Sequence, residues 1–353
     1  MILLRVTLLL GLALGSAAPA LAQSAAGTVG APSAPSTTST ASTTAPLHVA
    51  DLAPVLVSGV QPGPGLWLVS RGDHVMWVLG TLSPLPRNMQ WQSHELEQVI
   101  AESQQVLLQP AVKMKVDAGW LGKLFLLPSA YSARKNADGA TLREVLPPPL
   151  YARWQTLQQK YLPDARKVER WRPLFAAQDL YKKALAAHQL SNGGGVRQRI
   201  DALAKQHGVK ETPVEYQVVI EHPSAAIKAF KQSAPNDITC FSRTLESIEQ
   251  DMPAMMSRAN AWATGDLQAL RTLPDSDRRG ACVAALTNAG FARTLGLDDV
   301  VNQLESTWLD AARAALATNA QTFAVLPMDE LLKPDGYMAK LKAEGYQVEP
   351  PTE

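Results

Sequence analysis

Two short runs of alternating apolar and polar residues open the patterned part of the chain. They lie in GLWLVSRGDHVMWVLGTLS, residues 65–83, on either side of Arg71-Gly72-Asp73, a tripeptide typical of turns. The pattern predicts a β-hairpin whose second strand ends near Gly80. Because binding and catalytic groups are often mounted at strand ends, Ser83 is the first candidate for a functional side chain.

The next segments switch between helical and strand patterns. Leu96, Val99 and Ile100 share one face of a helix expected at about 91–105, with Ser93 as its N-cap. The sequence QVLLQPAV, residues 105–112, then indicates a short strand. A strand, a helix and a second strand in this order predict a βαβ unit with parallel strands.

The rest of the chain is mainly helical in pattern. Helices are expected across 119–208, 238–272 and 298–318, and short strands at 213–219 and 322–327. A last helix should end at Gly345, and YQVEPP (346–351) could add an edge strand whose prolines discourage further pairing. These elements predict an α/β (α+β) protein with a small mixed central β-sheet, an N-terminal hairpin and many surrounding α-helices.

The first 50 residues have a different composition. Residues 1–22 combine Arg5, a long apolar stretch and the small pair Ala20 and Ala22, which is the pattern of a secretory signal peptide cleaved near Ala22. Residues 23–50, rich in Ala, Ser, Thr and Pro, predict a disordered tether. We therefore expect one exported domain over 51–353, with a helical insertion at about 119–208, in the periplasm or secreted. No later stretch is apolar enough for a transmembrane helix.

Charge and cysteine content narrow the partners and the compartment. The formal net charge is +1, and basic and acidic residues are interspersed, which argues against nucleic acid as a partner. In an oxidising compartment Cys240 and Cys282 could form a disulfide that closes a loop of roughly 40 residues. Two separate buried thiols are the alternative, because the spacing alone does not show that the two Cα atoms approach, but we favour the disulfide.

Five motifs, in order, resemble the TraB/GumN family, which is related to the TIKI metalloproteases. They are the hairpin GLWLVSRGDHVMWVLGTLS, DGATLREVLPPPLYARW, WRPLFAAQDL, AWATGDLQAL and the ending FAV…DGYMAKLKAEGYQV. The resemblance covers nearly all of residues 65–348. It implies an α/β fold of the ChaN/erythromycin-esterase type and, in the TIKI branch, a metal-dependent hydrolase.

The positions that resemble the family's metal site carry different residues in this chain. The resemblance implies two G-x-x-H motifs and glutamates at nearby strand ends. Ser83 and Asp329 stand where the two histidines would be, Gln109 replaces one glutamate, and Glu215 keeps a family carboxylate. Because a hydroxyl and an amide are poor ligands for a transition metal, we expect that the ancestral divalent metal has been lost and that no cofactor is bound.

Two interpretations of the function follow. The first is a non-catalytic pseudoenzyme of the cell envelope, either a protein that binds a peptide, a glycan or an envelope protein, or a structural or surface-polysaccharide accessory protein. The alternative is a peptidase-like hydrolase with a residual metal site or a site rebuilt around Ser83, with His222 as base and Glu215 or Asp329 as the orienting acid. Glu215, Asp329 and Glu305 could also hold Ca²⁺ or Mg²⁺ weakly, although solvated acids fit the sequence as well. The oligomeric state stays open.

Overall fold

The computed structural model describes residues 61–87, 89–91, 94–164, 166–192, 195–232, 237–273, 277–287, 292–293 and 295–351. These residues belong to one unit of the chain, Leu52–Glu353. The predicted signal peptide, the predicted tether and the expected N-cap Ser93 lie outside the described residues.

A six-stranded mixed sheet in the order β10-β1-β2-β9-β4-β7 forms the centre of the fold. Its strands are β1 (Leu66–Arg71), β2 (His74–Thr81), β4 (Gln105–Leu107), β7 (Lys210–Thr212), β9 (Gln321–Pro327) and β10 (Gln347–Glu349). The hairpin β1–β2 and the edge strand β10 are antiparallel, whereas β2, β9, β4 and β7 run parallel. The predicted mixed sheet with an N-terminal hairpin is therefore confirmed.

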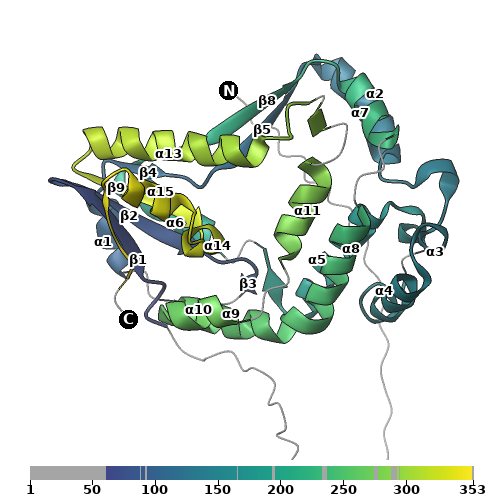
Figure 1. The fold of residues 1–353 in the computed structure, drawn as a ribbon, viewed down its shortest axis with the longest axis horizontal. Coiled ribbons are helices and arrows are strands. Elements are labelled where there is room, and N and C mark those ends of the chain that lie inside the picture. Colours follow the sequence, from purple (N-terminus) through teal and green to yellow (C-terminus); the bar gives the residue numbers. More distant parts are fainter. Residues whose placement is uncertain are drawn as a thin grey trace, which may run out of the picture. The chain divides into compact units, whose positions relative to one another are not determined.

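Helices cover the two faces of this sheet (Figure 1). The helix α1 (His94–Glu102) packs beside α6 (Val196–His207), and α13 (Val300–Thr318) contacts β2 and β9 together with α15 (Tyr337–Ala343). The connection through α1 runs from β2 past β9 to β4, whereas the connection through α13 returns in the opposite direction along the sheet to β9. Because crossovers between parallel strands are right-handed, these two helices lie on opposite faces of the sheet. The side chains of β2 and β9 are buried between these helices, for example Val78 and Phe323, each 0% exposed.

A second hydrophobic cluster lies in the helical part of the chain. Trp154 of α4 (Pro148–Tyr161) packs against Phe241 of α8 (Asp237–Glu246), and Leu180 of α5 (Pro173–Ala187) belongs to the same cluster. Cys240 of α8 and Cys282 of α11 (Arg278–Thr287) form the expected disulfide. Such a bond fits a protein that resides in an oxidising, extracellular environment.

The strands predicted at 105–112 and 213–219 differ from those in the structure. The first is divided into β4 and β5 (Ala111–Val116), because Pro110 has no backbone N–H to continue the ladder. The second corresponds to β8 (Glu215–Ile220), which pairs with β5 in a separate two-stranded sheet. A second two-stranded sheet joins β3 (Leu85–Pro86) to β6 (Leu190–Ser191), and β6 lies inside the region 119–208 that was expected to be helical.

The remaining described elements connect these parts. They are α2 (Trp120–Ser132), η1 (Ala137–Gly139), α3 (Leu142–Val145), η2 (Val168–Arg170), α7 (Pro223–Gln232), η3 (Ser247–Asp251), α9 (Met252–Thr264), α10 (Leu267–Thr272) and α14 (Met328–Leu332). Among the described helices, none combines the length and the apolar character that a membrane span requires.

Candidate functional site

Three candidate residues follow three neighbouring parallel strands at the same interval. Ser83, Gln109 and Asp329 each lie two positions beyond the end of β2, β4 and β9 respectively. In the sheet, β9 is hydrogen-bonded to β2 on one side and to β4 on the other. Because all three strands run parallel, their carboxyl ends meet at one edge, and the three side chains line one cavity there.

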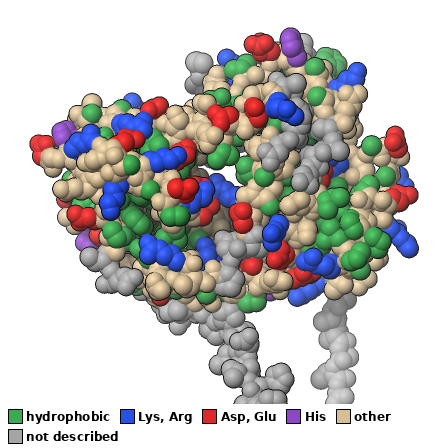
Figure 2. Space-filling view, in the orientation of Figure 1, with side chains coloured by type: hydrophobic (Ala, Val, Ile, Leu, Met, Phe, Trp, Pro, Cys, Tyr) green, Lys and Arg blue, Asp and Glu red, His purple; other side chains and the backbone are tan. Residues whose placement is uncertain are grey.

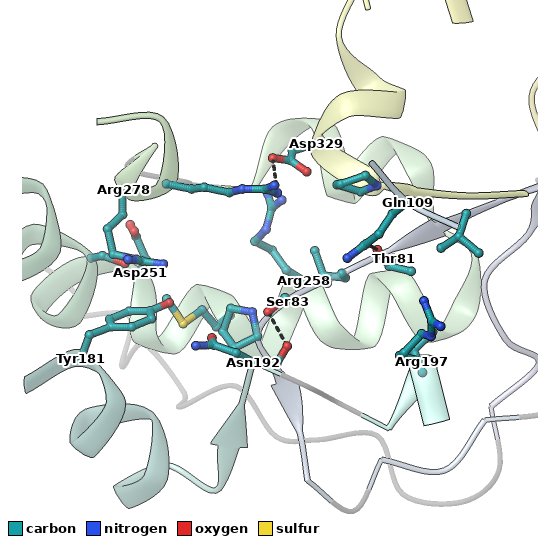
Figure 3. A pocket seen from close by; sticks show the side chains of 18 of the residues that line it. Thr81, Ser83, Gln109, Tyr181, Asn192, Arg197, Asp251, Arg258, Arg278 and Asp329 are labelled. Atoms are coloured by element: carbon teal, nitrogen blue, oxygen red, sulfur yellow. Dashed lines mark hydrogen bonds and ion pairs between the residues drawn. The ribbon is translucent and has the colours of Figure 1, made fainter. Parts of the chain in front are cut away.

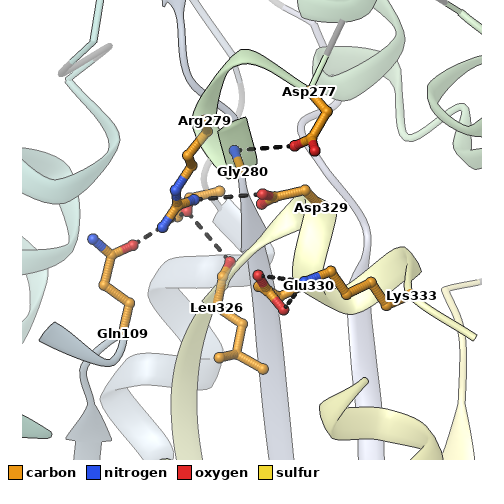
Figure 4. Close-up of polar contacts among 9 residues, drawn as sticks. Gln109, Asp277, Arg279, Gly280, Leu326, Asp329, Glu330 and Lys333 are labelled. Atoms are coloured by element: carbon orange, nitrogen blue, oxygen red, sulfur yellow. Dashed lines mark hydrogen bonds and ion pairs between the residues drawn. The ribbon is translucent and has the colours of Figure 1, made fainter. Parts of the chain in front are cut away.

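The side chains at this edge are engaged with the protein itself (Figure 4). The hydroxyl of Ser83 donates to the backbone carbonyl of Asn192 at 3.0 Å. The hydroxyl of Thr81 lies 3.5 Å from Oε1 of Gln109 and 3.3 Å from the carbonyl oxygen of Leu326. The carboxylate of Asp329 is 3.5 Å from Nη1 of Arg279. These are ordinary polar contacts, and they hold a hydroxyl, an amide and a paired carboxylate at the strand ends.

The cavity at the strand ends has a volume of about 400 Å³, and helices form its opposite wall. Figure 2 shows this face of the molecule hollowed near its centre, with both basic and acidic side chains at the hollow. Figure 3 shows the lining side chains approaching from the sheet edge and from several helices. The polar residues on the helical side are Tyr181, Asn192, Arg197, Ser247, Asp251, Arg258, Arg278 and Arg279.

One part of the helical wall is a π-helical turn. The segment η3 begins at Ser247 and ends at Asp251, and both residues are buried and line the cavity. An extra residue in the turn rotates the following helix relative to α8, and such turns recur at functional sites. The π-turn therefore brings a hydroxyl and a carboxylate to the cavity from the junction of α8 and α9.

The arginines are the feature that the sequence reasoning missed. Arg197 lies on α6, Arg258 on α9, and Arg278 and Arg279 in the first turn of α11. Arg197, Arg278 and Arg279 share one available signal, because each stands in the first turn of its helix and basic residues are disfavoured at the positive end of a helix. Arg258 carries no such signal and looks like an ordinary charge on a helix surface.

Other candidate residues lie outside the cavity lining. Glu215 forms an ion pair with Lys113 across the β5–β8 sheet, with Nζ and Oε2 2.5 Å apart. His222 is exposed where β8 leads into α7, and its carbonyl accepts from the amide of Ala226. Glu305 pairs with Lys340 at 2.6 Å. The structure thus brings Ser83, Gln109 and Asp329 together but leaves Glu215, His222 and Glu305 elsewhere.

The donor set at the strand ends does not match a transition-metal site. Such sites use imidazole, thiolate or carboxylate ligands that converge on one point. In the described part of the chain, no group of three or more His, Cys, Asp or Glu side chains converges in this way. We therefore derive no chemistry through a metal at this site.

Comparison with known proteins gives a match at the level of a protein family. Residues 65–350 match the model of the TraB/PrgY/gumN family, which covers most of the chain. No significant match was found among curated proteins or among solved structures.

Proposed function

The chain belongs to the TraB/PrgY/gumN family, and from this premise we propose that it is an exported, non-catalytic protein of the cell envelope that binds a ligand in the strand-end cavity. Two features support this proposal. The chain matches the family over most of its length, and the side chains at the strand ends of the cavity can form hydrogen bonds to a ligand. The ligand class we expect is a short peptide or a glycan, since a cavity of about 400 Å³ accommodates a small ligand or one end of a larger one.

The observation that supports binding over hydrolysis is the set of partners at the strand ends. The Ser83 hydroxyl donates to a backbone carbonyl, whereas a nucleophilic serine must donate to a general base. Asp329 faces Arg279, so its charge is already partly compensated. A hydroxyl, an amide and a paired carboxylate favour hydrogen bonding to a ligand.

The rival proposal, a hydrolase rebuilt around Ser83, requires a base in hydrogen-bond or one-water reach. Among the described residues that line the cavity there is no histidine. His222 and Glu215 belong to the segment around β8, whose strand pairs in the separate β5–β8 sheet. No observation in the structure favours this rival.

Export to the periplasm or beyond is part of the proposal. The disulfide Cys240–Cys282 supports it, because such bonds persist in oxidising compartments. The signal-peptide pattern of residues 1–22 supports it from the sequence.

One experiment tests the absence of catalysis. The mature protein is purified without chelator, its metal content is measured by mass spectrometry, and its hydrolysis of a peptide library is followed with and without EDTA. We expect substoichiometric metal and no more turnover than Ser83→Ala or Asp329→Asn shows. A stoichiometric transition metal, or a peptidase activity that EDTA or either substitution abolishes, would overturn the proposal.

A second experiment tests binding in the cavity. A panel of short peptides and oligosaccharides is screened by thermal shift against wild type and against Asn192→Trp, which places a large side chain at an exposed position of the lining. Gln98→Trp, at an exposed position of α1, is the matched control. A ligand that stabilises wild type and the control but not Asn192→Trp is expected. Ligands that stabilise all three proteins equally would place binding elsewhere.

A further inference from the structure

The charged lining of the cavity is predominantly basic. It contains four arginines (197, 258, 278 and 279) against two aspartates (251 and 329), a formal excess of two positive charges. The chain as a whole is nearly neutral, with a formal charge of +1. Positive charge is therefore concentrated in this cavity, where a partly enclosed wall strengthens its attraction for an anion.

Two of the four guanidinium groups are strongly engaged with the protein. Arg197 forms ion pairs with Asp201 and with Glu211, whose pKa is raised by burial and by the neighbouring Asp201. Arg258 donates from Nη1 to the carbonyl oxygens of Leu270 and Leu273, 3.2 and 3.3 Å away. Each of these two side chains therefore has two polar partners within the protein.

The other two guanidinium groups have much weaker engagements. Arg278 lies over the ring of Tyr181, with its Cζ atom 4.0 Å from the ring centroid. Arg279 reaches Asp329 only at 3.5 Å, and the two side chains are 63% and 47% exposed. A pair so long and so exposed contributes little, and its donors remain available to a ligand.

The turn that carries this pair is held in place. Cys282 follows Arg279 by three residues on α11, one helical turn away, and its disulfide to Cys240 fixes α11 against α8. Tyr181 of α5 supports the guanidinium of Arg278 by stacking. The two arginines therefore reach the cavity from a helix that the disulfide holds in place. This limits the conformational entropy that the protein loses when a ligand binds.

We propose that Arg278 and Arg279 form a recognition site for the oxyanion of a small ligand, a carboxylate or a phosphate group, in the strand-end cavity. A guanidinium binds either group through two parallel hydrogen bonds, which a lysine cannot reproduce. Asn192, Gln109 and Ser83 line the same cavity and offer neutral hydrogen-bonding groups to the remainder of the ligand. The inference rests on the proposed binding role of the cavity and adds the chemical class of the ligand.

Titration calorimetry on the mature protein at low ionic strength tests the site. The probes are inorganic phosphate, malonate and the neutral diamide malonamide. We expect phosphate or malonate to bind and malonamide not to bind, with the stronger of the two anions identifying the ligand group. Binding should weaken as NaCl is added, because salt screens the interaction. No binding of either anion, or equal binding of malonamide, would overturn the proposal.

Variants locate the bound anion. Arg278→Gln combined with Arg279→Gln should weaken anion binding at least tenfold, and Arg279→Lys should weaken it while keeping the charge. Arg271→Gln, at an exposed position of α10 outside the cavity lining, is the matched control and should leave affinity within twofold. Circular dichroism and melting curves establish that each variant is folded. Unchanged affinity in the folded double variant would contradict the assignment.

The results of the anion-binding experiments can be distinguished from a failure of the proposed non-catalytic function. A chelator-sensitive peptidase activity would remove the non-catalytic role but leave the arginine pair as a site for an acidic substrate. Loss of the anion site would leave a non-catalytic protein that binds a neutral ligand.

Discussion

The indole nitrogen of Trp262 donates a hydrogen bond of 2.7 Å to the carbonyl oxygen of Gly80, 182 positions earlier in the chain. Trp262 is fully buried in α9, and Gly80 is the next-to-last residue of β2. The bond joins the AWATGDLQAL motif to the GT motif at the strand end. It fixes the end of β2 against α9, which contributes Met255 and Arg258 to the cavity wall.

Trp262→Phe should lower the free energy of unfolding by about 1–3 kcal/mol beyond the loss of packing, because the carbonyl of Gly80 loses its buried donor. Trp308→Phe is the control, since Trp308 is equally buried but its indole N–H has no hydrogen-bond partner among the described residues. Urea denaturation measures both. Equal destabilisation by the two substitutions would contradict the importance of this bond.

Two buried side chains of α14 pack directly on Gly80. A Cβ at this position would lie 2.4 Å from Cε of Met328 and 2.9 Å from Cδ1 of Leu331. Gly80→Ala should therefore cost about 1–3 kcal/mol through overpacking, measured by thermal or chemical denaturation. Gly119→Ala is the matched control, because a Cβ there meets nothing within 4 Å. Equal stability of Gly80→Ala and Gly119→Ala would contradict close packing of α14 against Gly80 of β2.

Arg172 and Asp237 form a buried ion pair, with Nε and Oδ2 3.0 Å apart and side chains 8% and 7% exposed. Burial raises the pKa of Asp237 although Arg172 opposes the shift, so desolvation outweighs their attraction. Arg172→Met or Asp237→Leu alone should cost about 3–5 kcal/mol, because each leaves a buried charge unpaired. The double variant should be more stable than either single variant. A double-mutant cycle by urea denaturation measures this, and additive losses would contradict it.

Arg313 of α13 binds both carboxylate oxygens of Glu344, at 2.8 and 2.7 Å, and lowers the pKa of Glu344. A lowered pKa in the folded state means that the stabilisation is present above the unfolded-state pKa and is lost as pH falls through the folded-state pKa. Glu344→Gln should therefore destabilise the protein near pH 7 by at most about 1 kcal/mol, since the pair is partly exposed. The difference from wild type should disappear in acid.

Melting curves across pH measure this effect of Glu344→Gln. Glu221→Gln, at an exposed position, is the control and should show no such dependence. A difference between Glu344→Gln and wild type that persists below the acidic range of carboxylate titration would exclude the ion pair as its cause.

Much of the fold follows from local patterns in the sequence. The alternation in residues 65–83 predicts the hairpin, and TFAVLP predicts β9, because a strand buried on both faces reads as a continuous apolar run. The predicted disulfide also forms. The pattern at 213–219 predicts a strand but not its partner. Pairing with β5, about 100 residues earlier in the chain, has no local signal in the sequence.

Only some residues of the candidate site can be predicted from the sequence. Ser83 could be proposed from its place after the predicted hairpin, and Gln109 and Asp329 from the resemblance to the family's metal-site positions; parallel strands bring all three to one edge. Glu215 was proposed from the resemblance and His222 from its place after a predicted strand, but that strand, β8, belongs to the β5–β8 sheet, whose separation from the central sheet is not encoded in the strand patterns themselves.

The sequence by itself determined the hairpin, β9 and most of the helical segments, and that Ser83 and Asp329 follow strands, because hydrophobic periodicity is a property of neighbouring residues. Only the tertiary structure decided what faces those residues. The guanidinium groups of Arg278 and Arg279 lie opposite Asp329 and Gln109 through the packing of α11 on α8 and of the helices on the sheet edge. Those contacts join residues far apart in the chain, and the charges they bring together look in sequence like any solvated helix surface.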